Sequence, residues 1–318
     1  MEYFEVEGGH RLQGTITPQG AKNESLQILC ATLLSAEPIT ISNIPNIVDV
    51  NRLIDILRSI GVSVVQDAED TYTFQAANID LDYLQTEEYQ AKARKLRGSI
   101  MLVGPLLARF GQAFISRPGG DKIGRRRLDT HFWGFQQLGA KFNYDSKEEV
   151  FQVKAPGKLK GTYMLLDEAS VTGTANLVMA AVLAEGTTTI YHAACEPYLQ
   201  QLCEMLNRMG ADIQGIGSNL LIINGVDELG GTNHRMLSDM IEVGSFIGMA
   251  AMTQSQLTIK NAGVKYLGII PETFRRMGVK LEISGDDIIV HQSEMLQIPT
   301  SFMEATHRFR SSVGGLYH

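Results

Sequence analysis

The 318 residues include 28 Lys and Arg against 35 Asp and Glu, a formal net charge of −7 at pH 7, and 44% of them are hydrophobic. These values are typical of a globular chain of two domains and argue against a whole-surface affinity for nucleic acid or anionic lipid. Three cysteines without a CxxC pattern favour a reducing compartment. We expect a cytoplasmic protein, because the first residues lack the pattern of a secretory signal and no apolar run reaches the ~20 residues of a membrane span.

Four segments of the chain share one layout, which predicts an internal repeat. Each has an apolar helix, a short β-branched strand, an amphipathic helix, a glycine turn and two further strands. The turn glycines, spaced 78, 71 and 68 residues apart, are Gly61, Gly139, Gly210 and Gly278. Each fits the position just after a helix, where left-handed backbone is favoured.

The expected elements follow the same order in every unit. The apolar helices are expected at residues 24–36, 96–110, 174–186 and 241–254, and the strands after them at 38–43, 112–117, 187–192 and 256–261. Pro105 predicts a kink or break in the second of these helices, and Ser284–Asp287 a hairpin turn in the last unit. Because the helices are apolar on nearly all sides and the strands carry polar residues in alternation, we expect helices in the core and sheets facing solvent.

Basic residues gather in one part of this acidic chain. Between Ala91 and Arg127 the sequence has ten Lys or Arg residues and a single acid, Asp121. They surround the loop RPGGDKIGRRRLD, which leads from a strand into a helix. Glycine-exposed N–H groups, a helix N-terminus and bidentate arginines together predict binding of a small polyanion. A solvated cationic face is the simpler alternative.

Two further motifs stand at expected helix starts. Lys22 and Asn23 follow the glycine turn of TPQGAKN and suit an anionic ligand group, although a surface lysine beside a turn is the simpler interpretation. Ser170 and Thr172 in DEASVTGT either cap the third apolar helix or place hydroxyl and N–H groups near a phosphate.

These motifs resemble those of enolpyruvyl transferases, and specifically the UDP-N-acetylglucosamine 1-carboxyvinyltransferase family. The similarity includes LQGTITPQGAKNESL, RPGGDKIGRRRLDTH, EPYLQQLCEMLNRMGADI and IEVGSF and covers residues 1 to about 300. It implies an α/β fold, an inside-out α/β barrel of repeated βαβαββ units, with three units in each of two domains. The first domain would comprise residues 1–21 and 236–318, and the second residues 22–235 with the Asp121 loop.

The resemblance also implies a reaction. Enolpyruvyl would pass from phosphoenolpyruvate to the 3′-hydroxyl of UDP-N-acetylglucosamine with release of phosphate, the first committed step of peptidoglycan precursor synthesis. The implied partners are these two small molecules, without metal, organic cofactor, nucleic acid or membrane. The substrate-binding positions carried over are Lys22, Asn23, Arg97, Arg126, Arg127, Leu128, Asp129, Thr130, Ser170 and Val171.

Lys22 and Asp121 are the catalytic candidates that the resemblance implies. Asp121 stands where the family commonly has cysteine, and we expect it to act as the general acid of an addition–elimination or to orient phosphate release. Glu168 stands where the family often has lysine, and Met240 where it commonly has arginine. These two departures weaken the corresponding contacts.

The length sets one more expectation. At roughly 70 residues a unit, the chain holds four units and the start of a fifth, so the resemblance implies truncation at the C-terminus. The general base of the family belongs to its later units and has no candidate here. The alternatives are an inactive fragment or a non-catalytic binding module of the same fold. Less favoured is 3-phosphoshikimate 1-carboxyvinyltransferase, whose Lys-Ser start and Gly-Asn-Ala-Gly-Thr loop are missing.

Overall fold

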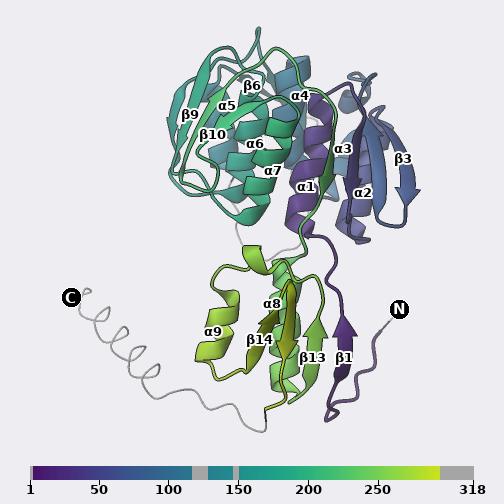
Figure 1. Ribbon diagram of the computed structural model, residues 1–318. Helices are drawn as coiled ribbons and strands as arrows, with labels where there is room; N and C mark the ends of the chain where they lie inside the picture. The colour runs from purple at the N-terminus through teal and green to yellow at the C-terminus, as the bar shows by residue number, and fades with distance from the viewer. Residues whose placement is uncertain (1–2, 117–127, 146–149, 294–318) are drawn as a thin grey trace, which may run out of the picture. The chain divides into compact units, whose positions relative to one another are not determined.

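The computed structural model of the protein describes residues 3–116, 128–145 and 150–293. The chain divides into two compact parts (Figure 1). The split unit joins Met1–Gln19 to Ser238–His318, and the continuous unit is Gly20–Leu237.

The continuous unit holds most of the helices and strands. In chain order they are α1 (Lys22–Ala31), η1 (Thr32–Leu34), β2 (Ile39–Ser42), α2 (Val48–Ser59), β3 (Ser63–Ala68), β4 (Thr71–Gln75), η2 (Tyr83–Gln85), α3 (Glu87–Arg94), η3 (Arg97–Leu102), α4 (Val103–Phe110), β5 (Gln112–Ser116), α5 (Asp129–Gln137), β6 (Lys141–Asp145), β7 (Val150–Lys154), β8 (Tyr163–Leu165), α6 (Val171–Ala181), β9 (Thr187–Tyr191), α7 (Pro197–Arg208), β10 (Asp212–Gln214), β11 (Leu220–Asn224) and β12 (Thr232–Arg235). The split unit has β1 (Gln13–Ile16), α8 (Met240–Met252), β13 (Gln256–Ile259), η4 (Val264–Tyr266), α9 (Ile270–Arg276), β14 (Leu281–Ser284) and β15 (Asp287–Val290).

The repeat expected from the sequence is confirmed, with three copies in the continuous unit and a fourth in the split unit. The four turn glycines have φ values of 99°, 94°, 107° and 89°, all left-handed. The break near Pro105 is also confirmed, and it falls just before the proline. The 3₁₀ helix η3 ends at Leu102 and α4 begins at Val103, so Pro105 lies in a first turn, where its missing N–H needs no partner.

Four sheets account for the strands that the structure describes, and these strands close no continuous barrel. Three sheets belong to the continuous unit, in the orders β12-β2-β4-β3, β5-β7-β6 and β10-β11-β9-β8. The sheet of the split unit has the order β1-β13-β15-β14. Strand β1 precedes the first repeat yet pairs in parallel with β13 of the fourth, while β12 precedes the fourth repeat and pairs in parallel with β2 of the first. The first and fourth repeats therefore exchange their leading strands.

Helices occupy the interior of the continuous unit, as the apolar runs predicted. Every residue of α6 from Gly173 to Ala181 is buried, and α6 packs against α1, α4, α5 and α7. Strand β9 instead alternates, with Thr188 and Ile190 buried and Thr187 and Tyr191 exposed. The sheets thus cover a helical core with one face and meet solvent with the other.

A buried polar cluster joins three of these helices. The Oδ1 atom of Asn176 accepts a hydrogen bond from the N–H of Gly104 at 2.8 Å, and its Nδ2 donates to the carbonyl of Ile100 at 2.8 Å. The same Nδ2 lies 3.1 Å from Nδ1 of His131, whose Nε2 is 3.3 Å from Oγ1 of Thr172. Because an amide nitrogen only donates, Nδ1 of the imidazole accepts and the ring is neutral.

The close approach of α4 to α6 gives a first prediction. A Cβ atom on Gly104 would lie 2.3 Å from the carbonyl oxygen of Asn176 and 2.5 Å from its Oδ1, whereas one on Gly157 would meet no described atom within 4 Å. We expect Gly104→Ala to lower the free energy of unfolding by about 2 kcal/mol or more, because backbone must move. Urea unfolding of both variants checks this, and equal midpoints for Gly104→Ala and Gly157→Ala would contradict it.

The burial of His131 gives a second prediction. Burial, with a smaller contribution from the charge of Arg97, lowers the pKa of His131 from its ordinary 6.5 to about 4. Between these values the unfolded chain binds a proton that the folded chain excludes, so folding stability falls as the pH falls. From pH 7 to pH 5 this linkage removes about 2 kcal/mol. Urea unfolding at several pH values should show a smaller loss for His131→Gln than for wild type, and His10→Gln, at an exposed histidine, should retain the full loss.

Candidate functional site

The predicted pair Lys22 and Asn23 opens α1, and both residues are exposed at the N-terminus of the helix. The Nζ atom of Lys22 lies 2.6 Å from Oδ2 of Asp49, which is in the first turn of α2. A Cβ atom on Gly20 would lie 1.7 Å from the carbonyl oxygen of Asn43, so the turn before α1 accepts only glycine. The glycine of the motif therefore sets the entry of the chain into α1.

Arg97 begins η3, which packs against α1. A Cβ atom on Gly98 would lie 3.1 Å from the side chain of Leu26, about one turn after Lys22. In the same region Nη1 of Arg52 donates to the carbonyl oxygen of Lys95 at 3.3 Å. The segment around Arg97 is thus anchored beside the N-terminal halves of α1 and α2.

Leu128, Asp129 and Thr130 form the start of α5, with Leu128 at the N-cap position. Thr130 is buried, and its Oγ1 lies 3.4 Å from Oδ1 of Asp167 and 3.5 Å from Oε1 of Glu168. Glu168, which replaces a lysine common in the resembling family, therefore approaches a predicted binding residue. These contacts are at the outer limit of a hydrogen bond.

Ser170 and Val171 form the start of α6. The Oγ atom of Ser170 accepts a hydrogen bond from the N–H of Gly173 at 3.1 Å, so the capping interpretation is confirmed for Ser170. Oγ1 of Thr172 instead lies 3.3 Å from Nε2 of His131. A Cβ atom on Gly173 would be 2.9 Å from Cγ2 of Thr130, which places the first turns of α5 and α6 in contact.

The structure therefore collects most of the described candidates on helix N-termini of the continuous unit. The starts of α5 and α6 touch, and the charge of Arg97 reaches His131, next to Thr130. Lys22 and Asn23 lie at the start of α1, against which η3 packs. Helix N-termini carry unsatisfied N–H groups and partial positive charge, so this arrangement can hold anions. Asp121, Arg126 and Arg127 lie outside the described residues.

Three residues next to the candidate site residues were given no role on the basis of the sequence. Asp49 pairs with Lys22, Asp167 approaches Thr130, and His131 is buried in the first turn of α5. The one available signal was the position of Asp49 in the first turn of an amphipathic helix. Among the described residues, no group of three or more His, Cys, Asp or Glu is arranged to hold a metal ion. Nor does any helix in the described part have the length and apolarity to cross a membrane.

Known proteins are similar to this chain over most of its length. A family model described as EPSP synthase (3-phosphoshikimate 1-carboxyvinyltransferase) matches residues 6–310. A relative in Bacteroides fragilis named UDP-N-acetylglucosamine 1-carboxyvinyltransferase is 64% identical over 96% of this chain and 70% of its own length. A relative of the same name in Porphyromonas gingivalis is 58% identical over the same shares.

Solved structures share the fold at lower identity. The enolpyruvyl transferase NikO of Streptomyces tendae has a TM-score of 0.79 and 21% identity, covering 91% of this chain and 68% of its own. EPSP synthase of Acinetobacter baumannii has a TM-score of 0.66 and 19% identity, covering 90% and 66%. Sequence and fold agree, and the chain belongs to the enolpyruvyl transferase family, in which it groups with the UDP-N-acetylglucosamine 1-carboxyvinyltransferases.

Proposed function

We propose that this protein transfers the enolpyruvyl group of phosphoenolpyruvate to the 3′-hydroxyl of UDP-N-acetylglucosamine and releases phosphate. The observation that carries the proposal is the 64% identity to a relative of that name over 96% of the chain. The free cysteines support a cytoplasmic setting, with Cys30 and Cys203 buried and Cys195 exposed.

The charges of the two substrates match what the helix starts offer. Phosphoenolpyruvate brings a phosphate and a carboxylate, and we assign its binding to Lys22, Asn23 and Arg97. The sugar nucleotide brings a diphosphate, which we assign to the N-termini of α5 and α6, with Leu128–Thr130, Ser170 and Val171, and to Arg126 and Arg127. Each group is stabilised where N–H donors and cations converge.

The chemistry requires a proton to be added and another removed. The acceptor hydroxyl gives its proton to a general base, which the family carries in its later units, as its oxygen bonds to C2 of phosphoenolpyruvate. C3 takes a proton from the general acid, for which we propose Asp121. The tetrahedral adduct then returns a proton from C3 to the carboxylate of Asp121 and expels phosphate, which restores the double bond. The ordinary pKa of an aspartic acid is about 3.9 and that of a cysteine about 8.5, so retention of the proton by Asp121 depends on the negative charge of the bound substrates. Lys22 and Arg97 stabilise the charge on the departing phosphate.

A phosphate-release assay with matched lysine variants tests the donor site. Lys22 and Lys158 are both part-exposed and paired with an aspartate, Lys22 with Asp49 at 2.6 Å and Lys158 with Asp227 at 2.8 Å. We expect Lys22→Ala to lower turnover about 100-fold through loss of a cation at the phosphate, and Lys158→Ala to leave turnover unchanged.

The same assay tests the acceptor substrate. Phosphate release that proceeds equally well with shikimate 3-phosphate as acceptor would contradict the proposed substrate. If wild type binds both substrates without releasing phosphate, the alternative of a non-catalytic binding protein holds.

The role of Asp121 is tested separately. Asp121→Ala and Asp121→Asn should both lower turnover by about 100-fold or more, because neither side chain can deliver an acidic proton. The affinity for UDP-N-acetylglucosamine, measured by calorimetry, should change little in either variant. Asp227→Asn serves as a control in a part of the chain assigned no role. Full turnover in Asp121→Ala would remove Asp121 from the mechanism.

A further inference from the structure

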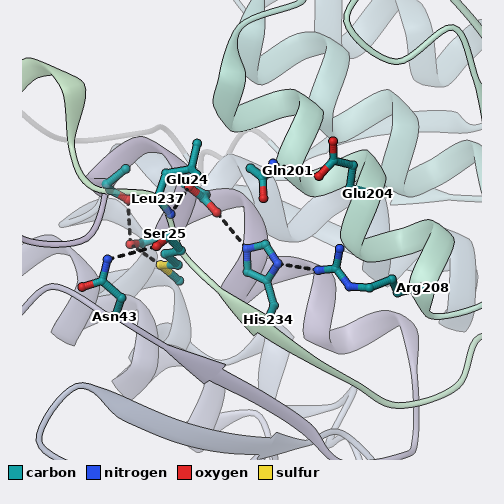
Figure 2. Close-up of polar contacts among 10 residues, drawn as sticks. Glu24, Ser25, Asn43, Gln201, Glu204, Arg208, His234 and Leu237 are labelled. Atoms are coloured by element: carbon teal, nitrogen blue, oxygen red, sulfur yellow. Dashed lines mark hydrogen bonds and ion pairs between the residues drawn. The ribbon is translucent and has the colours of Figure 1, made fainter. Parts of the chain in front are cut away.

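A series of polar side chains joins the first turn of α1 to β12 and α7 in the interior of the continuous unit (Figure 2). Glu24 comes from the first turn of α1, His234 from β12 and Arg208 from the last turn of α7. The side chains of Glu24 and His234 are at most 1% exposed. Their Oε1 and Nε2 atoms are 2.8 Å apart, and Nδ1 of His234 is 2.7 Å from Nη2 of Arg208.

The proton positions along this series of side chains follow from the chemistry of its two end residues, Glu24 and Arg208. A guanidinium can only donate, so Nδ1 of His234 accepts and its single proton lies on Nε2. That proton is donated to Oε1 of Glu24, and Oε2 of Glu24 accepts the N–H of Leu237 at 3.0 Å. Both oxygens are therefore occupied as acceptors, and Arg208 balances the charge of an ionised Glu24 across a neutral imidazole.

Other charged groups face Glu24 as well. Burial raises the pKa of Glu24, whereas His234 and the Leu237 N–H oppose that rise, and the nearby carboxylate of Glu204 adds to it. Glu204 accepts a separate hydrogen bond from Nε2 of Gln201 at 2.9 Å. An ionised, buried carboxylate is costly unless its partners are in place. The hydrogen bonds from His234 and Leu237 are thus required for Glu24 to carry a negative charge in the interior.

The same turn of α1 is fixed to residues 236 and 237 by further bonds. The N–H of Ala21 donates to the carbonyl oxygen of Leu237 at 2.8 Å, and Oγ of Ser25 lies 3.1 Å from Sδ of Met236. Nδ2 of Asn43 donates to the carbonyl oxygen of Met236 at 3.0 Å. Lys22 and Asn23 stand between Ala21 and Glu24, so the residues on both sides of them are held.

The position of Glu24 also matters electrostatically. A carboxylate in the first turn of a helix uses the same partial positive charge that an anionic ligand at that N-terminus would use. Because Arg208 neutralises Glu24 through His234, the start of α1 remains favourable for a second anion. Loss of either partner would leave an uncompensated negative charge directly behind Lys22 and Asn23.

We propose that Glu24, held by His234 and Arg208, is a positioning residue that fixes the first turn of α1 and keeps its N-terminus available to the anionic groups of phosphoenolpyruvate. This inference rests on the proposed function, because it assigns phosphoenolpyruvate to Lys22 and Asn23. Glu24 itself contacts protein groups and acts through the turn that it holds.

The test compares variants of the whole chain by calorimetry with each substrate and by hydrogen exchange. Glu24→Gln keeps the volume but cannot accept from both His234 and Leu237, and Arg208→Met removes the donor to His234. Both should weaken phosphoenolpyruvate binding about tenfold, with less than a twofold change for UDP-N-acetylglucosamine, and both should speed amide exchange at Ala21 and Leu237. Arg208→Lys, which retains a donor, should restore most of the affinity. Glu204→Gln is the matched control: it removes the neighbouring negative charge but none of the hydrogen bonds to Glu24, so it should weaken neither phosphoenolpyruvate binding nor the protection of Ala21 and Leu237.

The outcomes separate this inference from the proposed function. Wild-type affinity for phosphoenolpyruvate in Glu24→Gln, together with faster exchange at Leu237, would overturn the positioning role. An equal loss of affinity for both substrates would overturn it too, because it would indicate general loss of structure. If wild type binds neither substrate, the proposed function fails, and exchange at Ala21 and Leu237 then decides alone whether Glu24 fixes the turn, with unchanged rates in Glu24→Gln contradicting it.

Discussion

The parallel pairing of β12 with β2 is the constraint on which the rest of the structure depends. It places Thr232 opposite Ile39 and so returns the chain, after three repeats, to the side of the first. Parallel strands need a crossover, and here the crossover is most of the continuous unit. Through this pairing His234 reaches Glu24, and Met236 and Leu237 reach the turn that begins α1. The positions of Lys22 and Asn23 are thus set by residues more than 200 positions later in the sequence.

The candidate site combines weakly held cations with firmly held backbone. The ion pair of Lys22 with Asp49 is part-exposed on both sides, and such pairs contribute only about 0–1 kcal/mol. Under the proposed function, a phosphate that binds at Lys22 would replace Asp49 as its partner at little cost. Beneath this exposed layer the support is buried: Asn176 and His131 join α4, α5 and α6, while Glu24 and His234 join α1 to β12. A rigid backbone beneath a cation whose partner can be exchanged suits the binding of a small anion, because little conformational freedom is lost on binding.

Features that depend on neighbouring residues were predictable from the sequence. A glycine after an amphipathic helix requires left-handed backbone wherever the helix lies, and Gly61 and Gly210 confirm it. A serine before an apolar helix caps it, as Ser170 does. Partners distant in sequence were not predictable in this way. The polar residues Glu24 and His234 look like surface positions in a linear sequence, and only the pairing of β12 with β2 shows that they are buried together. Likewise, local patterns do not reveal that β1 joins the sheet of the fourth repeat.

The exchange of leading strands has a consequence for synthesis on the ribosome. Strand β1 leaves the ribosome long before its partner β13, which begins at Gln256, after the whole of the continuous unit. Until then β1 has an unpaired edge, while β12 can already complete the sheet of the first repeat. The continuous unit is in effect an insertion within the split unit, and domains generally fold as units during synthesis. Strand β1 is therefore made before the continuous unit but reaches its final place after it.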